Sequence, residues 1–268
     1  MIFSKTLVKK NIAGTQFRRL FSTTIDDTEV RNFNKISDWW QKDGSMKALH
    51  AYNKLRVKFI RQHLLEAHKP EWRHNFFKTL KALDWGCGGG LLTESLGRLG
   101  WETIGIDPTE MSINVAKEHL CNDTELFERI DYRQVTIEKL IEDEKFINYF
   151  DFAASVEVIE HVKNPEIFVR DIVKSVKPGG FIFISTLART IESWLLTVKA
   201  AEDFLGLVPQ GTHDWEKFIN ADELHEMLTN SGWTVIETQG TFYDPINNYM
   251  YKRTSLDNNY IIAAKKII

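Results

Sequence analysis

The pattern of apolar and polar residues changes about a third of the way along the chain. Residues 30–40 and 50–67 mix the two kinds at helical spacing and predict two helices. From about residue 80, short apolar runs alternate with amphipathic segments. We expect strands at 79–85, 102–107, 132–135, 150–158 and 181–185, and helices at 91–99, 112–120 and 165–176. The last of these helices ends at a strong turn signal, Lys177-Pro178-Gly179-Gly180.

Strands and helices that alternate in this way predict an α/β fold on a doubly wound, Rossmann-like parallel sheet with helices on both faces. Beyond residue 185 we expect helices at 193–208 and 221–230 and closing strands at 233–237 and 260–264. The link between these two strands is too short for a helical crossover, so they are expected to pair antiparallel. The prediction is a seven-stranded domain at 76–268, an N-terminal helical cap at 22–75, and a helical insertion after the fifth strand at about 190–220.

Composition and charge narrow the class of protein. The formal net charge of −3 on 268 residues argues against a nucleic-acid binder that relies on bulk electrostatics. No apolar run reaches the ~18 residues of a membrane-spanning helix. Two cysteines without CxxC spacing, Cys87 and Cys121, indicate neither a disulfide framework nor a zinc site. Residues 1–25 are basic, rich in hydroxyl groups and free of acidic residues, which predicts a mitochondrial transit peptide at 1–21. The alternative is a basic tail that stays attached.

A glycine-rich turn follows the first expected strand and reads Asp84-Trp85-Gly86-Cys87-Gly88-Gly89-Gly90. Glycine lets the backbone turn sharply and approach a ligand closely. A dinucleotide loop has GxGxxG spacing and would need a glycine where this chain has Leu91, which disfavours a nicotinamide dehydrogenase. The GxGxG pattern of Gly86, Gly88 and Gly90 is instead typical of S-adenosylmethionine sites.

Asp107 ends the second expected strand, 21 residues after Gly86. An acid at this place accepts hydrogen bonds from the ribose hydroxyls of a bound nucleoside. An alternative role is to cap the helix that begins near Ser112, although Ser112 or Thr109 could do so without it. The candidate cofactor-binding residues are therefore Asp84 and the glycines of the turn, together with Asp107.

A third group of polar residues, Glu157-Val158-Ile159-Glu160-His161, follows the fourth expected strand and faces the same crevice. Two carboxylates and an imidazole within five residues could ligate one divalent ion, such as magnesium, manganese or zinc. Two alternatives stay open at this point. Glu157 could hydrogen-bond only to loop amides, and His161 could be a metal-free general base or a packing residue.

These and further motifs resemble the ubiquinone-biosynthesis O-methyltransferases of mitochondria and bacteria over about residues 28–264. The motifs are Asn53-Lys54-Leu55-Arg56, the glycine-rich turn, Glu157 to Val162, Val176-Lys177-Pro178-Gly179-Gly180, Ser185-Thr186-Leu187-Ala188-Arg189-Thr190, Val208-Pro209-Gln210-Gly211-Thr212-His213-Asp214-Trp215 and Tyr243-Asp244-Pro245. The Ser-Thr-Leu and Gly-Thr-His-Asp segments are the most specific. Trp85 is a departure, because the family usually has a small aliphatic residue there.

The resemblance implies the class I methyltransferase fold, with S-adenosylmethionine held by Arg56, Gly86, Asp107 and Val156. It implies a divalent metal, above all magnesium, on Glu157, Glu160 and His161. It also implies a peripheral protein on the matrix side of the mitochondrial inner membrane, in a complex with other ubiquinone-biosynthesis proteins.

The expected reaction is methylation of a catechol-type hydroxyl on a polyprenylated ring, such as 3,4-dihydroxy-5-polyprenylbenzoate or demethylubiquinol. A metal at Glu157, Glu160 and His161 would lower the pKa of that hydroxyl, so that the phenolate attacks the methyl group in line. The heavily apolar helix at 193–208 is expected either to pack on the sheet or to shelter the polyprenyl tail. Alternatives are a metal-independent enzyme with His161 as base, a C- or N-methyltransferase, and a non-catalytic assembly subunit that binds the cofactor.

Overall fold

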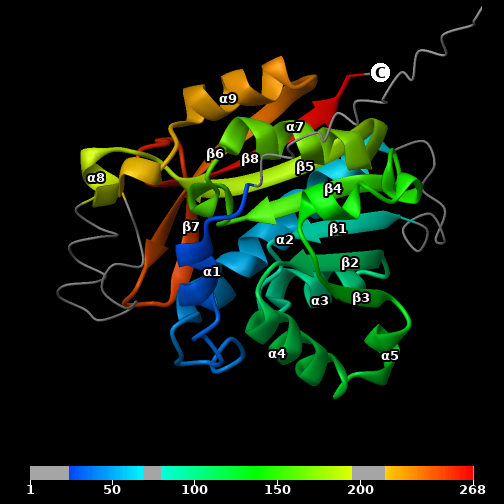
Figure 1. Cartoon of the computed structure of the whole chain (residues 1–268). Coiled ribbons are helices and arrows are strands. Elements are labelled where there is room, and N and C mark those ends of the chain that lie inside the picture. Colours follow the sequence, from blue (N-terminus) through cyan, green and yellow to red (C-terminus); the bar gives the residue numbers. More distant parts are fainter. Residues whose placement is uncertain (1–23, 69–79, 195–214, 268) are drawn as a thin grey trace, which may run out of the picture.

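The computed structural model of the chain describes residues 24–68, 80–194 and 215–267 (Figure 1). The predicted transit peptide at 1–21, most of the apolar segment at 193–208 and the Gly211-Thr212-His213-Asp214 motif lie outside the described residues. Among the helices that are described, none has the length and apolar character needed to cross a bilayer.

The described chain forms one mixed sheet in the order β3-β2-β1-β4-β5-β8-β6-β7. In chain order its strands are β1 (Lys81–Trp85), β2 (Glu102–Asp107), β3 (Ile130–Gln134), β4 (Phe150–Val156), β5 (Val176–Leu187), β6 (Trp233–Asp244), β7 (Tyr249–Arg253) and β8 (Asn259–Lys266). Strands β1 to β5 run parallel, and β8, β6 and β7 pair antiparallel beyond β5.

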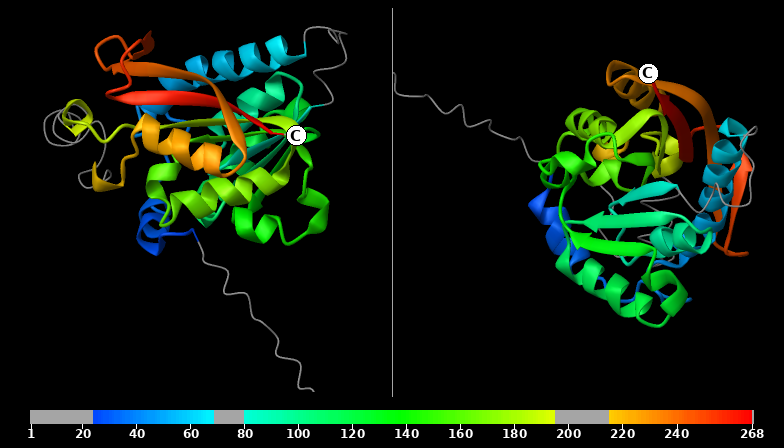
Figure 2. Two further views of the ribbon diagram at one scale, coloured as in Figure 1. Left: turned by 90° about the horizontal axis from the view of Figure 1, so that it is seen from above. Right: turned by 90° about the vertical axis from the view of Figure 1, so that its right-hand side faces the viewer.

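Helices cover both faces of the sheet (Figure 2). They are α1 (Asp27–Phe33), α2 (Lys47–Ala67), α3 (Leu91–Arg98), α4 (Glu110–Leu120), α5 (Thr124–Phe127), α6 (Ile137–Leu140), α7 (Pro165–Ser175), α8 (Ile191–Ser193) and α9 (Ala221–Asn230). Side chains alternate between the faces along β4: Phe152 belongs to the apolar cluster that contains Phe59 of α2, whereas Ala153 belongs to the cluster that contains Phe168 of α7. Both faces of this central strand are therefore buried, as its largely apolar sequence predicts.

The predicted α/β class and the antiparallel pairing of the closing strands are confirmed, since Trp233 of β6 lies opposite Lys266 of β8. The predicted number of seven strands is wrong, because β7 adds an eighth strand at the edge of the sheet. Only Met250 of β7 is buried. An edge strand with so little apolar sequence gives no hydrophobic signal.

Two other local expectations differ from the structure. The helix expected at 30–40 ends at Phe33, and the chain then turns. There the Asp38 carboxylate accepts hydrogen bonds from the Ser45 N–H and Oγ at 2.7 Å each. The turn expected at residues 177–180 lies within β5, where Gly179 has a φ of 75° and the register against β4 shifts.

The sheet reverses its strand order at β1, which lies between β2 and β4. In parallel sheets such a reversal leaves a crevice beyond the carboxyl ends of the strands, since the crossover helices leave in opposite directions. The glycine-rich turn follows β1, and Glu157 to His161 follow β4. The two segments that carry most of the predicted chemistry are therefore neighbours.

We expect Phe168→Ala to lower the free energy of unfolding by about 3–5 kcal/mol in urea titrations. The ring of Phe168 is fully buried, and its centroid lies 3.9 Å from that of Trp85. The matched control is Phe127→Ala, since Phe127 is 62% exposed, and it should change the value by about 0.5 kcal/mol or less. Equal losses for the two variants would contradict this account of the core.

Candidate functional site

The glycine-rich turn owes its shape to close packing beneath its backbone. Gly86 has a φ of 70°, and a Cβ on it would lie 2.4 Å from Cγ2 of Val158. Gly88 also lies in the left-handed region, with a φ of 52°. Cys87, between them, is a buried free thiol whose pKa is raised by burial. A side chain at either glycine would strain the turn, and one on Gly86 would also separate the turn from the segment after β4.

Asp107 ties the turn to the second strand. Its Oδ2 accepts the Gly88 N–H at 3.1 Å and its Oδ1 accepts the Thr109 N–H at 2.8 Å. Burial raises the pKa of this carboxyl, and the N–H groups of Thr109 and Gly88 oppose that rise. The N-cap of α4 is Thr109, whose side chain makes no capping hydrogen bond. Asp107 thus supports both the glycine-rich turn and the start of α4.

Asp84 lies deeper, near the end of β1. It is fully buried, and its Oδ2 accepts a hydrogen bond from Thr93 Oγ1 of α3 at 2.6 Å. Burial raises the pKa of the Asp84 carboxyl to about 7, although the Thr93 hydroxyl opposes this. The hydrogen bond between Asp84 and Thr93 connects β1 to α3, the two elements on either side of the glycine-rich turn.

Arg56 enters the site from α2 and pairs with Glu157. Its Nη2 lies 2.9 Å from Glu157 Oε1, and its guanidinium carbon lies 3.7 Å from the ring centroid of Tyr52. Arg56 is only 3% exposed, and its Nε has no hydrogen-bond partner in the described chain. Glu157 has a φ of 55°, which is unusual for a residue other than glycine, and also accepts a hydrogen bond from Ser185 Oγ at 2.8 Å. The pair therefore fixes a buried cation beside the glycine-rich turn.

Glu160 and His161 lie on a short 3-10 helix at 159–161 and have different partners. Glu160 accepts a hydrogen bond from Thr186 Oγ1 at 2.9 Å. Burial and the nearby charge of Glu157 raise the pKa of the Glu160 carboxyl. His161 Nδ1 lies 3.1 Å from Glu29 Oε2 of α1. Burial lowers the pKa of His161, but its hydrogen bond to Glu29 and the surrounding carboxylates outweigh this and raise it.

The three predicted metal ligands do not form a metal-binding group in the part of the chain that the structure describes. No set of three or more histidine, cysteine or acidic side chains is arranged there to hold an ion. Glu157 is held by Arg56, Glu160 by Thr186 and His161 by Glu29. The described residues therefore do not support a shared metal ion at these three side chains.

One cavity of about 1180 Å³ joins these residues. Every predicted site residue lines it: Arg56, Asp84, Gly86, Gly88, Asp107, Val156, Glu157, Glu160 and His161. One cavity is thus lined by the glycine-rich turn, the buried guanidinium of Arg56, the carboxyl of Asp107 at the end of β2 and the imidazole of His161. Such a combination can hold a charged nucleoside next to a group that accepts protons.

Residues 24–46, here called the roof segment, cover the cavity, and sequence reasoning did not assign them to the site. Thr24 fixes one end, because its N–H donates to Glu138 Oε1 at 2.8 Å and its carbonyl accepts the Lys163 N–H at 2.9 Å. Farther along, Glu29 pairs with Lys217 at 2.9 Å as well as with His161. The adjacent tryptophans Trp39 and Trp40, two large aromatic residues outside the predicted sheet domain, were the signal that could have revealed this segment.

Comparisons with known proteins agree with this geometry. A family model described as a methyltransferase domain matches residues 52–238. The chain is 38% identical to the mitochondrial ubiquinone biosynthesis O-methyltransferase of Mus musculus, over 93% of this chain and 68% of that protein. It is also 38% identical to the ubiquinone biosynthesis O-methyltransferase of Bartonella tribocorum, over 91% of this chain and 97% of that protein.

Solved structures show the likeness of fold. A magnesium protoporphyrin IX methyltransferase from Synechocystis, with bound S-adenosylhomocysteine, superimposes with a TM-score of 0.58 at 14% identity, over 90% of this chain and 94% of that one. A methyltransferase from Thermotoga maritima, described as a possible histamine N-methyltransferase, gives a TM-score of 0.57 at 14% identity, over 89% of this chain and 99% of that one. The expected class I methyltransferase fold is therefore confirmed.

We expect Asp107→Asn to weaken binding of S-adenosylhomocysteine about 10- to 100-fold in calorimetric titrations, because a charge-assisted hydrogen bond to the ligand is lost. Asp131→Asn is the control, since Asp131 is half exposed on β3 and pairs with Arg133. The affinity of the Asp131→Asn variant for S-adenosylhomocysteine should equal that of the unsubstituted protein. Unchanged binding by Asp107→Asn would show that Asp107 shapes the turn without contacting the ligand.

Proposed function

The chain belongs to the ubiquinone biosynthesis O-methyltransferases and is an S-adenosylmethionine-dependent enzyme, and we propose that it methylates a catechol-type hydroxyl on a polyprenylated aromatic ring. The main support is the shared cavity, in which Arg56 and Asp107 lie next to the turn that carries His161. A methyl donor and an acceptor whose proton must be removed would meet there. Substrates of this kind include 3,4-dihydroxy-5-polyprenylbenzoate and demethylubiquinol.

The residues of the cavity fit the methyl donor. Arg56 carries a buried donor, Nε, that has no hydrogen-bond partner among the described residues, and a guanidinium suits the carboxylate of the methionine part. Asp107 lines the cavity, which supports a role as acceptor for the ribose hydroxyls, and Gly86 and Gly88 of the turn line it as well. When bound, S-adenosylmethionine supplies a methyl group already activated by its positive sulfur. The protein must then align the acceptor and remove its proton.

His161 is the proposed proton acceptor. Its ring lines the cavity and is oriented from behind by the Glu29 carboxylate, as in other carboxylate–histidine pairs. The edge of the Phe33 ring also contacts it, with centroids 5.0 Å apart. Because Glu29 and the neighbouring carboxylates raise the pKa of His161, the neutral form that can accept a proton becomes abundant only as the pH rises.

A route through a divalent metal is the alternative, and it rests on the resemblance and on the two carboxylates and the imidazole within five residues. Glu157 would have to leave Arg56 to reach an ion, whereas His161 could keep its Nδ1 contact with Glu29 and ligate through Nε2. We therefore derive no step through a metal. Chelation separates the two routes experimentally, because only the metal route depends on it.

The acceptor's apolar character is consistent with the lining of the cavity. Apolar side chains from the roof segment and from β5 to β7 contribute to it: Val30, Phe33, Met46, Leu187, Phe242 and Met250. Transfer of an aromatic ring with an apolar substituent from water to a site among these side chains is favourable. Whether residues 193–208 shelter the tail stays a prediction, since most of that segment lies outside the described residues.

We also propose that the protein works in mitochondria, peripherally on the matrix side of the inner membrane, with other ubiquinone-biosynthesis proteins. The basic, acid-free residues 1–21 support import, and the relatives from Mus musculus and Homo sapiens are described as mitochondrial. A polyprenylated substrate would itself reside in a membrane, which favours a location at its surface.

The test of the reaction is transfer of a labelled methyl group from S-adenosylmethionine to a polyprenylated catechol, with the product's methylated atom identified by mass spectrometry. We expect an aryl methyl ether, and equal turnover before and after treatment with a chelator. Turnover that is lost with the chelator and restored by magnesium, manganese or zinc would replace His161 by a metal as the activating group. Methylation at carbon or nitrogen, or no transfer by protein that binds the cofactor, would contradict the proposed function.

We expect Glu29→Gln to shift the acidic limb of the kcat/KM pH profile to lower pH. The substitution removes the negative partner that raises the pKa of His161, so neutral imidazole persists to lower pH. Asp26→Asn is the matched control, because Asp26 pairs with the same Lys217, at 3.3 Å, and the structure shows no contact between Asp26 and His161. Identical profiles for Glu29→Gln and the unsubstituted enzyme would remove His161 from the role of base.

A further inference from the structure

The roof segment touches the glycine-rich turn through one tryptophan. A Cβ on Gly88 would lie 2.4 Å from Cη2 of Trp39, and a Cβ on Gly89 would lie 2.4 Å from Cγ of the same indole. The indole therefore lies along the backbone of both glycines. Trp39 is 6% exposed and lines the cavity. Whatever occupies the space above the turn must pass or displace this ring.

Trp39 also has an unused donor. Its indole Nε1 is buried, and within the described residues it has no hydrogen-bond partner. Buried indole N–H groups normally find an acceptor, because an unpaired one costs free energy. A side chain that lines the cavity and lacks an acceptor is suited to contact a bound ligand rather than only to fill space.

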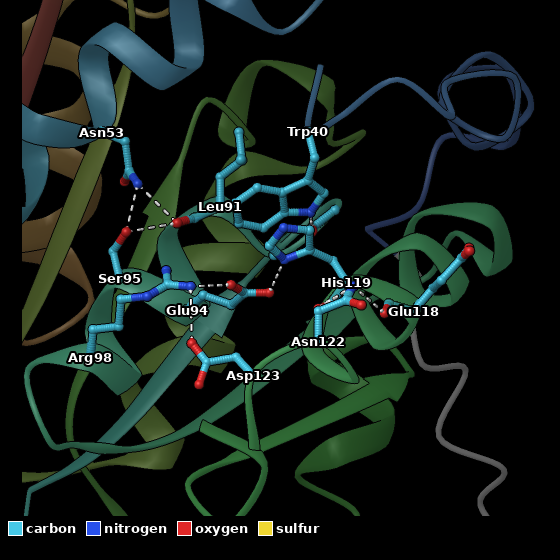
Figure 3. A network of polar contacts seen from close by, with 12 residues as sticks. Trp40, Asn53, Leu91, Glu94, Ser95, Arg98, Glu118, His119, Asn122 and Asp123 are labelled. Carbon is cyan, nitrogen blue, oxygen red and sulfur yellow. Dashed lines mark hydrogen bonds and ion pairs between the residues drawn. The ribbon is translucent and has the colours of Figure 1, made fainter. Parts of the chain in front are cut away.

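The neighbouring Trp40 is fastened to the body of the domain (Figure 3). Its Nε1 donates to the Gly89 carbonyl at 2.8 Å. Its ring stacks on the imidazole of His119 in α4, with centroids 3.4 Å apart and an interplanar angle of 1°. These two contacts attach the roof segment to the turn and to α4 at one point.

His119 is in turn held by Glu94 of α3. Its Nδ1 lies 2.7 Å from Glu94 Oε1, while Glu94 Oε2 accepts a hydrogen bond from Arg98 at 2.9 Å. The carboxylate of Glu94 is fully buried, whereas the side chain of His119 is about a third exposed. Figure 3 shows Glu94 between Arg98 and His119, with the indole of Trp40 over the His119 ring. The hydrogen bond to Glu94 thereby fixes the orientation of the His119 ring that stacks on Trp40.

The remaining contacts of this part of the roof segment are modest. Its apolar side chains form a small cluster around Trp39, Met46 and Leu91, separate from the clusters that cover the sheet. The other polar contacts include Asn34 Oδ1 with the Met111 N–H at 3.2 Å and the Trp39 carbonyl with His50 Nε2 at 2.8 Å. A segment held by few contacts opens at low free-energy cost. The stacking of Trp40 on His119 is therefore a large share of the free energy that keeps this segment closed.

We propose that Trp39 closes over the bound cofactor, and that Trp40, His119 and Glu94 are positioning residues that latch it there and set the rate of cofactor exchange. This rests on the proposed function, since the ligand is S-adenosylmethionine or its product. Each turnover requires S-adenosylhomocysteine to leave past Trp39. The Trp40–His119 stack must open for that departure and re-form around the next cofactor molecule.

The test is the dissociation rate of labelled S-adenosylhomocysteine from the full-length protein, measured after adding excess unlabelled ligand. Trp40→Ala and His119→Ala should each raise the rate about three- to tenfold, as expected from the loss of one stacked ring pair. The double variant should match Trp40→Ala, because both substitutions break the same stack and only Trp40→Ala also removes the N–H donor to Gly89. Trp40→Phe, which keeps a ring over His119 but loses the N–H, should give an intermediate rate.

His225→Ala is the matched control, since His225 lies on α9 and hydrogen-bonds to Thr238 at 2.6 Å, on the opposite face of the sheet. Its dissociation rate should equal that of the unsubstituted protein, even if its melting temperature falls. Lower melting temperatures for Trp40→Ala and His119→Ala with unchanged dissociation rates would overturn the latch and leave a purely structural role. Failure of the unsubstituted protein to bind the ligand would instead overturn the proposed function itself.

Discussion

The site depends on the contact between Gly86 and Val158. These residues follow β1 and β4, two adjacent parallel strands at the point where the strand order reverses. The methyls of Val158 fill the place that a side chain on Gly86 would take, and the φ of 70° at Gly86 further restricts that position to glycine. This packing brings the loop that would hold the methyl donor against the turn that carries the proposed base. Separating the two by the width of a side chain would divide the cavity into unrelated halves.

Electrostatics within that cavity are dominated by one buried cation among several carboxylates. Arg56 is balanced by Glu157 and packs on the Tyr52 ring, while burial raises the pKa of Asp84 and of Asp107. Buried ion pairs add little net stability but are costly to break from one side, so their value lies in fixing geometry. Here the guanidinium is already oriented and desolvated before any ligand carboxylate arrives, which reduces the cost of binding one.

Much of the site was predictable because it follows from strand order. Asp107 and Glu157 end or follow parallel strands, and such positions meet at one edge of a sheet. The partners of these residues were not predictable. That Arg56 would pair with Glu157, or Glu29 with His161, depends on where α1 and α2 lie in the folded chain, which no local spacing encodes. Trp85, unusual in sequence, proves to be a packing residue on Phe168, and β7 was missed because an exposed edge strand has almost no apolar pattern.

The anchoring of Thr24 has a mechanical consequence. The roof segment is tied at that residue to Glu138 and Lys163, and at its other end it continues into α2, whose side chains are part of the core. The roof segment is therefore fixed at both of its ends. A segment fixed at both ends admits a ligand only when its middle moves outward. The size of that opening is limited by the length of chain between the two fixed ends. The segment can therefore open for a ligand and close again without leaving the domain.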